Sequence, residues 1–113
     1  MSFSVIPSDK FKKEAKRLTK KYPSLKTELA DLAQVLSVTP ETGTALGDNM
    51  FKIRLAIKSK GKGKSGGARV ITYAVTADEE VYLLTIYDKS ELDSVDDKTL
   101  VQIIKTLDTN TSI

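Results

Sequence analysis

Phe51-Lys52-Ile53-Arg54-Leu55-Ala56-Ile57-Lys58 is the stretch in which the hydrophobic period of this chain changes from 3.6 residues to 2. Apolar side chains occupy its odd positions, and basic side chains occupy most of its even ones. Alternate side chains of a β-strand point to opposite faces of its sheet. We therefore expect a strand whose apolar face packs on a core, while Lys52, Arg54 and Lys58 project together from the other face.

Two amphipathic helices are predicted on the N-terminal side of this strand. In each, apolar side chains recur at steps of four, three and four residues, which places them on one helical face. The two stripes are Phe11, Ala15, Leu18 and Tyr22, and then Leu25, Leu29, Leu32 and Leu36. Ser8 or Asp9 suits the start of the first helix and Ser24 the start of the second, because short oxygen side chains accept from free N–H groups. The short break at Pro23 predicts a helical hairpin.

The remaining segments complete an α+β pattern. Residues 3–5 are typical of a short opening strand, residues 38–49 of a loop, and residues 69–76 and 81–87 of strands buried on both faces. A C-terminal helix carries Leu100, Ile103, Ile104 and Leu107 at helical spacing, with Ser94 or Asp96 as its cap. We expect one domain over residues 1–113, with an N-terminal strand, a helical hairpin, an antiparallel three-to-four-stranded sheet and a C-terminal helix.

The composition excludes several kinds of chemistry. The 113 residues include no cysteine and no histidine, which removes disulfides, thiolate metal sites and the commonest general base and zinc ligand. We therefore expect neither a metal nor another cofactor. No stretch approaches the ~20 apolar residues of a membrane span, and the N-terminus lacks the pattern of a signal peptide. We expect a cytoplasmic protein that does not bind membranes.

The charge distribution is lopsided although the net charge is only +3. Of the 18 basic residues, 15 lie between Lys10 and Arg69, and residues 52–69 contain no acidic residue. Such a local field indicates a polyanionic ligand, although a solvated lysine-rich loop kept for solubility explains charge alone equally well.

The glycine-rich stretch in residues 59–67 formally matches G-x-G-x-x-G, but a strand rather than a helix follows it, so a dinucleotide site is excluded. A nucleotide-binding P-loop also fails, because Lys58 stands where its first glycine is required. Two interpretations remain. The segment is either a simple hairpin tip or a cationic flap that contacts phosphates through Lys60, Lys62 and Lys64.

Residues 51–54, 60–71 and 82–91 together resemble the RelE/ParE superfamily of toxins. They look closest to its HigB-type members, which have the same glycine- and lysine-rich loop before an arginine and the same strand ending in aromatic-x-Lys. The resemblance implies a RelE-like microbial RNase fold and endonucleolytic cleavage of mRNA in the ribosomal decoding site. It also implies a cognate antitoxin protein that neutralises the toxin, as in type II toxin–antitoxin systems.

The resemblance further implies a set of catalytic residues. Lys52 and Arg54 match a basic pair on one strand, Arg69 matches an arginine at the start of the next, and Lys89 matches a basic residue after the last strand. Some members place a catalytic tyrosine in the C-terminal helix, which has none here, so that role is absent or falls to Tyr87 or Tyr82. Lys58, Lys60, Lys62 and Lys64 are the predicted contacts to RNA and the ribosome.

These residues suit a reaction in which the 2′-hydroxyl of RNA attacks the adjacent phosphate. Guanidinium groups bind phosphate oxygens and stay charged, so we expect Arg54 and Arg69 to stabilise the developing charge. Lys52 is the candidate general base, because its positive neighbours disfavour its protonation. Lys89 or Tyr87 is the candidate acid. An alternative is that Lys52 and Arg54 only bind backbone phosphates, while the ribosome aligns the RNA for cleavage.

Two further functions remain open at this point. A ParE-like toxin shares the fold but inhibits DNA gyrase without nuclease activity, and a non-catalytic nucleic-acid-binding module needs only the basic face. Tyr73 and Tyr82 are expected in the core, while Tyr87, at the strand end beside Lys89, is also a candidate for stacking on bases.

Overall fold

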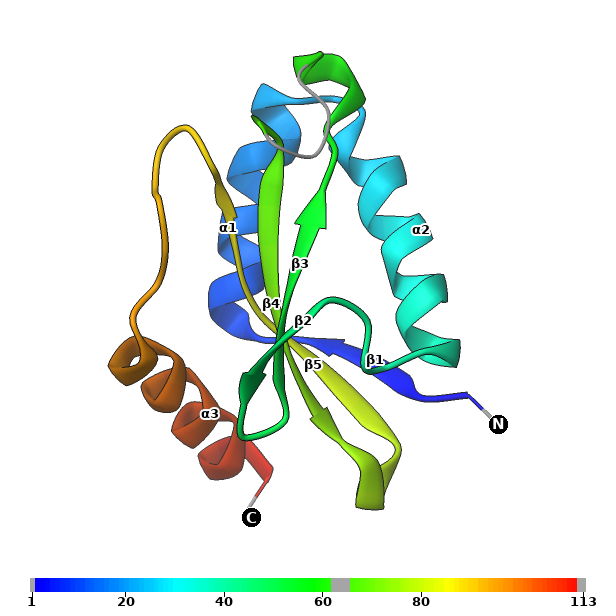
Figure 1. The fold of residues 1–113 in the computed structure, drawn as a ribbon, viewed down its shortest axis with the longest axis vertical. Helices are drawn as coiled ribbons and strands as arrows, with labels where there is room; N and C mark the ends of the chain where they lie inside the picture. Colours follow the sequence, from blue (N-terminus) through cyan, green and yellow to red (C-terminus); the bar gives the residue numbers. More distant parts are fainter. Residues whose placement is uncertain (1, 62–65, 112–113) are drawn as a thin grey trace.

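The computed structural model describes residues 2–61 and 66–111, with side chains described up to residue 107. The elements, in chain order, are β1 (Ser4–Pro7), α1 (Asp9–Lys21), α2 (Leu25–Val38), β2 (Thr44–Gly47), β3 (Met50–Leu55), η1 (Lys58–Lys60), β4 (Ala68–Val75), η3 (Thr76–Asp78), β5 (Glu80–Asp88) and α3 (Asp97–Thr111). They form an α+β fold in which α1 and α2 lie on one face of a sheet and α3 on the other (Figure 1). The predicted fold class is confirmed.

The sheet has five strands in the order β1-β5-β4-β3-β2. The pairs β2–β3, β3–β4 and β4–β5 are antiparallel, whereas β1 runs parallel to β5. The prediction of an antiparallel sheet of three to four strands was therefore wrong in two respects. The sheet has five strands, and its β1–β5 pair is parallel. β1 and β5 are not consecutive in the chain, so no tight turn requires them to be antiparallel. Pro7 is tolerated at the end of β1 because an edge strand can lack an N–H donor.

The fifth strand comes from residues 38–49, which the sequence predicted as a loop. All four residues of β2 are exposed, so the strand has no buried face and no hydrophobic alternation that sequence could show. Asp48 and Asn49 join β2 to β3 with φ angles of 53° and 64°. Two successive positive φ angles are the geometry of a type I′ turn, which suits a tight hairpin and favours Asp and Asn.

The core under the helical hairpin contains the predicted stripes. Leu18, Leu25 and Leu36 are fully buried and pack against residues such as Ile53 of β3. Ser8 caps α1 by accepting a hydrogen bond from the Phe11 N–H at 3.0 Å. No helix within the described residues is long and apolar enough to cross a membrane.

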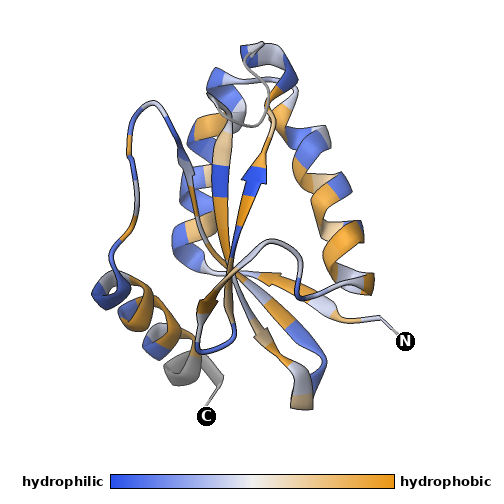
Figure 2. Cartoon of the chain, in the orientation of Figure 1, coloured by the Kyte–Doolittle hydropathy of each residue, from blue (hydrophilic) through white to orange (hydrophobic). Residues whose placement is uncertain are grey.

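The opposite face of the sheet is only partly covered. Asp96 precedes the C-terminal helix α3 and caps it by accepting a hydrogen bond from the Thr99 N–H. The helix buries its apolar side chains near Tyr82. Tyr82 is a buried member of this cluster, which confirms its predicted place in the core. Tyr73 is only partly buried and packs against the cluster, with its ring centroid 6.5 Å from that of Tyr82. One hydrophilic band interrupts each of the otherwise apolar strands β3 and β4, and the two bands lie side by side (Figure 2).

Candidate functional site

A cationic cavity lies on the sheet face that carries α3, at the end of the sheet that α3 leaves open. Its volume is about 250 Å³. Its lining residues are Thr44, Leu46, Lys52, Arg54, Arg69, Lys89 and Asp93. Four of the five residues predicted as catalytic therefore line one cavity, although they come from three different segments of the chain.

The strand register brings these side chains together. Arg54 of β3 stands opposite Arg69 of β4, and Arg69 stands opposite Tyr87 of β5. Residues directly opposite one another share a face of the sheet, with Cβ atoms about 4.5–5.5 Å apart. Lys52 lies two residues from Arg54 and therefore on the same face. The cavity floor thus carries cations of two neighbouring strands, Lys52 and Arg54 of β3 and Arg69 of β4.

Arg69 is the most buried of these cations, with 5% of its surface exposed. Its Nη1 donates a hydrogen bond to the carbonyl oxygen of Ala68 at 3.1 Å, which holds the guanidinium against the strand. Guanidinium groups stay charged in proteins, even when they are buried. Arg69 therefore supplies a fixed positive charge at the cavity floor, while Arg54 beside it is exposed.

Lys89 reaches the cavity from the turn after β5, where it forms an ion pair with Asp93. Its Nζ also donates to the carbonyl oxygen of Asp93 at 3.3 Å. The hydrogen bond and the charge of Lys89 lower the pKa of Asp93, and the charge of Lys52 acts in the same direction. Asp93 is thus an ionised carboxylate, and it is the only one among the described lining residues.

Asp93 was missed by the sequence reasoning, which concentrated on basic residues. Its spacing of four residues from Lys89 was the available signal. That signal is weak, because residues 78–108 hold 9 of the 15 acidic residues.

Tyr87 lies beside the cavity rather than in its lining. It is 5% exposed and packs in the cluster that includes Leu100 of α3. Its hydroxyl has no hydrogen-bond partner among the described residues. Burial raises the pKa of Tyr87, while the charges of Arg69 and Lys89 partly offset that effect. The phenol therefore keeps its proton at neutral pH.

The lysines predicted to contact RNA lie in different places. β3 ends at Leu55, and Lys58 is the first residue of η1. The expectation that Lys58 shares a strand face with Lys52 and Arg54 was therefore wrong. Its side chain is exposed beside a groove between α2 and β3. Lys60 turns inward to the buried carboxylate of Asp88, and Lys62 and Lys64 lie outside the described residues.

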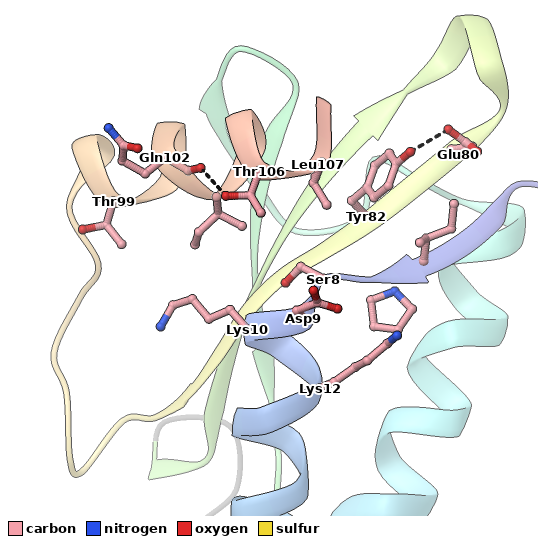
Figure 3. A pocket seen from close by; sticks show the side chains of 13 residues that line it. Ser8, Asp9, Lys10, Lys12, Glu80, Tyr82, Thr99, Gln102, Thr106 and Leu107 are labelled. Carbon is pink, nitrogen blue, oxygen red and sulfur yellow. Dashed lines mark hydrogen bonds between the residues drawn. The ribbon is translucent and has the colours of Figure 1, made fainter. Parts of the chain in front are cut away.

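A larger cavity of about 530 Å³ lies away from the cationic cavity, between β1, the start of α1 and α3. Figure 3 shows Asp9, Lys10, Lys12 and Glu80 around it, so charges of both signs are mixed there. No group of three or more acidic side chains that could hold a metal occurs within the described part of the chain. The cationic cavity is therefore the better candidate for a polyanionic ligand.

Comparison with known proteins bears on the fold. No family model matches the chain. Among solved structures, a double arginine-to-alanine mutant of the E. coli toxin RelE in the free state superposes with a TM-score of 0.62. The match covers 94% of this chain and 98% of that one, at 14% sequence identity. The predicted resemblance is thus supported for RelE, whereas closeness to the HigB type stays a prediction. The five-stranded sheet with its flanking helices has the fold of the RelE toxin.

Proposed function

We propose that this protein is the toxin of a toxin–antitoxin pair and that it cleaves mRNA endonucleolytically on the ribosome. The observation that carries the proposal is the cationic cavity, in which Lys52, Arg54, Arg69 and Lys89 converge on a RelE-like fold. A phosphate group fits such a cluster, because two guanidinium and two ammonium groups can share its oxygens. We further propose the HigB subtype, from the loop and strand motifs, and a location in the cytoplasm.

The proposed reaction uses the nucleophile that RNA itself provides. The 2′-oxygen attacks the adjacent phosphorus as its proton leaves, the bond from phosphorus to the 5′-oxygen breaks, and that oxygen takes up a proton. The products are a 2′,3′-cyclic phosphate and a free 5′-hydroxyl. This route requires no metal or other cofactor.

The residues divide this work according to their chemistry. Arg69 and Arg54 stabilise the charge that grows on the phosphate oxygens, which such preorganised donors achieve without reorganisation. Lys52 takes the 2′-proton. Tyr87 or Lys89 protonates the leaving oxygen; the raised pKa of Tyr87 means that its phenol still carries the proton at neutral pH, as a general acid must before the reaction.

The proposed contact to mRNA and the ribosome is the basic segment that follows β3, outside the lining of the cationic cavity. Lys58 is exposed at the start of η1 and available to RNA, and Lys62 and Lys64 follow it in the same basic stretch of sequence. A cognate antitoxin protein is the proposed partner that restrains the activity.

The experiment that tests the function is translation with purified ribosomes followed by primer-extension mapping of the message. We expect the wild type to cut mRNA and Arg69→Ala to lose roughly 100- to 1000-fold in kcat, the effect of removing one such charge-stabilising donor. Lys26→Ala, which removes an exposed cation from α2, is the matched control and should cleave normally. Undiminished cleavage by Arg69→Ala would sink the catalytic assignment.

The same assay separates the alternatives. Intact messages together with DNA damage indicate a ParE-like gyrase inhibitor. RNA binding without cleavage, even when ribosomes are present, indicates a non-catalytic binding module.

A further inference from the structure

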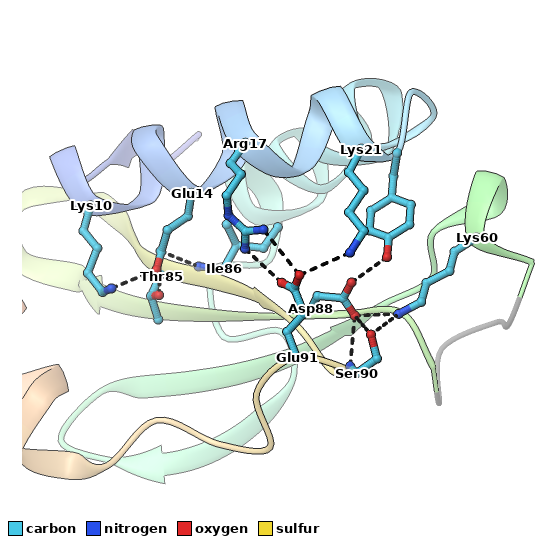
Figure 4. A network of polar contacts seen from close by, with 11 residues as sticks. Lys10, Glu14, Arg17, Lys21, Lys60, Thr85, Ile86, Asp88, Ser90 and Glu91 are labelled. Atoms are coloured by element: carbon cyan, nitrogen blue, oxygen red, sulfur yellow. Dashed lines mark hydrogen bonds and ion pairs between the residues drawn. The ribbon is translucent and has the colours of Figure 1, made fainter.

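Among the side chains that the structure describes, one carboxylate is completely buried, and it belongs to the residue before Lys89 of the cationic cavity. Asp88 ends β5 and has 0% of its surface exposed. Its Oδ2 accepts from the Tyr22 hydroxyl at 2.6 Å, and its Oδ1 accepts from Lys60 Nζ at 2.5 Å. Oδ1 also accepts from the backbone N–H of Ser90 at 2.9 Å and from its hydroxyl at 2.7 Å (Figure 4).

These partners come from three separate parts of the fold. Tyr22 is the C-cap residue that follows α1, Lys60 lies in η1, and Ser90 lies in the turn after β5. Lys60 is itself largely buried, with 10% of its side chain exposed, and stands over the Tyr22 ring at 5.5 Å from its centroid. A buried ion pair persists only when its remaining hydrogen-bonding capacity is satisfied, as it is here.

The charged form of Asp88 is strongly favoured by this arrangement. Burial by itself raises the pKa of the carboxyl, but the hydrogen bonds from Lys60, Tyr22 and Ser90 outweigh burial and hold that pKa well below its ordinary value. The network is therefore intact at neutral pH, where the proposed nuclease would act.

The turn that Asp88 fixes is the one that carries Lys89 and Asp93. The backbone N–H groups of Glu91 and Leu92 both donate to the carbonyl oxygen of Asp88, at 2.9 and 3.0 Å. The N–H of Lys89 donates to the carbonyl of Gly67 at 3.0 Å, which ties the turn to the start of β4. The side-chain carboxylate and the main-chain carbonyl of Asp88 thus both accept hydrogen bonds from this turn.

We propose that Asp88 is a positioning residue, whose buried carboxylate, paired with Lys60, sets the turn that presents Lys89 to the cavity of Arg54 and Arg69. The inference rests on the proposed function for its catalytic consequence. It also gives Lys60 a different role from the RNA contact predicted from sequence, since the Lys60 ammonium is engaged by Asp88 and Ser90 rather than directed to the cavity.

The test compares two carboxylates of the same turn. Asp88→Asn keeps the shape and removes the charge. Glu91→Gln is the matched control, because Glu91 pairs with Arg17 and Lys21 at the surface, where such pairs contribute little. We expect Asp88→Asn to lower kcat for mRNA cleavage roughly 10- to 100-fold, as misplacement of a catalytic group does, with a small change in KM. Glu91→Gln should retain the wild-type kcat.

A double-mutant cycle distinguishes positioning from general damage. If Asp88 acts through Lys89, then Asp88→Asn in a Lys89→Met background changes kcat by less than about twofold, because the group that it positions is gone. Losses that multiply in the double variant, or a folded Asp88→Asn with the wild-type kcat, would overturn the proposal. If Asp88→Asn does not fold, Tyr22→Phe removes one hydrogen bond to Asp88 and keeps the ring, and the same cycle is run with it.

Amide hydrogen exchange keeps this inference separable from the proposed function. Without ribosomes, the N–H groups of Ser90 and Leu92 should exchange roughly tenfold faster in Asp88→Asn than in the wild type, while Glu91→Gln leaves them unchanged. If the wild type cuts no RNA, the nuclease proposal fails and the exchange rates alone decide whether Asp88 orders the turn. Unchanged exchange in Asp88→Asn refutes that role.

Discussion

Replacing Tyr87 with Phe is expected to move stability and activity in opposite directions. The Tyr87 hydroxyl is buried and has no hydrogen-bond partner among the described residues, so the fold gains nothing from it. The proposed reaction, by contrast, needs a proton donor near Arg69 and Lys89, whose charges both act on this phenol. The substitution removes one oxygen atom and keeps the ring that packs against α3.

The size of each effect follows from the environment of the hydroxyl. A buried polar group without a partner costs about 1–3 kcal/mol, so its removal should stabilise the fold by about 1 kcal/mol. For a chain of this size, about 1 kcal/mol corresponds to a rise in Tm of about 4 °C. Loss of a general acid lowers kcat roughly 100- to 10,000-fold.

Urea unfolding measures the first effect, and single-turnover cleavage of mRNA on ribosomes measures the second. Tyr73→Phe is the matched control, since Tyr73 packs on Tyr82 of the same face and does not line the cationic cavity. It should leave kcat unchanged.

Two results would refute the reasoning. A loss of stability in Tyr87→Phe would mean that the hydroxyl contributes to the fold after all. A wild-type kcat would remove Tyr87 from the chemistry and leave Lys89 as the candidate acid.

Three further predictions concern the core, the buried carboxylate and the cavity. Leu18→Ala should lower the free energy of unfolding by about 2–5 kcal/mol, because Leu18 is fully buried between α1 and the sheet; urea unfolding that shows a loss below about 1 kcal/mol contradicts this packing. The folded-state pKa of Asp88 lies below its unfolded value of about 3.9. Its contribution is therefore complete above that pH and lost as the pH falls through the folded-state pKa, so the stability difference between wild type and Asp88→Asn should shrink in unfolding curves below about pH 4. Asp93→Asn frees Lys89 and removes the carboxylate from the cavity, so RNA should bind several-fold more tightly in a filter-binding titration at low salt, and weaker binding would argue against a phosphate site.

Local patterns of the sequence were sufficient for the helices and the inner strands. The stripes that include Leu18 and Leu36 predicted the buried faces of α1 and α2, because a helix returns every 3.6 residues to the same side. The alternation from Phe51 predicted that Lys52 and Arg54 share a face, because a strand repeats every two residues. β2 was missed because an exposed edge strand buries no side chain and so leaves no such period.

What only the tertiary structure decided is which distant residues meet. The register of β3, β4 and β5 places Arg69 between Arg54 and Tyr87, and no period within one segment contains that information. The burial of Asp88 is a stronger case, since an acidic residue at a strand end is ordinarily expected in water. A carboxylate stays charged inside a protein only when donors surround it, and its donors Tyr22 and Lys60 lie 66 and 28 residues away along the chain. The sequence by itself determined the basic character of this surface, and the fold decided which cations face the cavity and which one is held by Asp88.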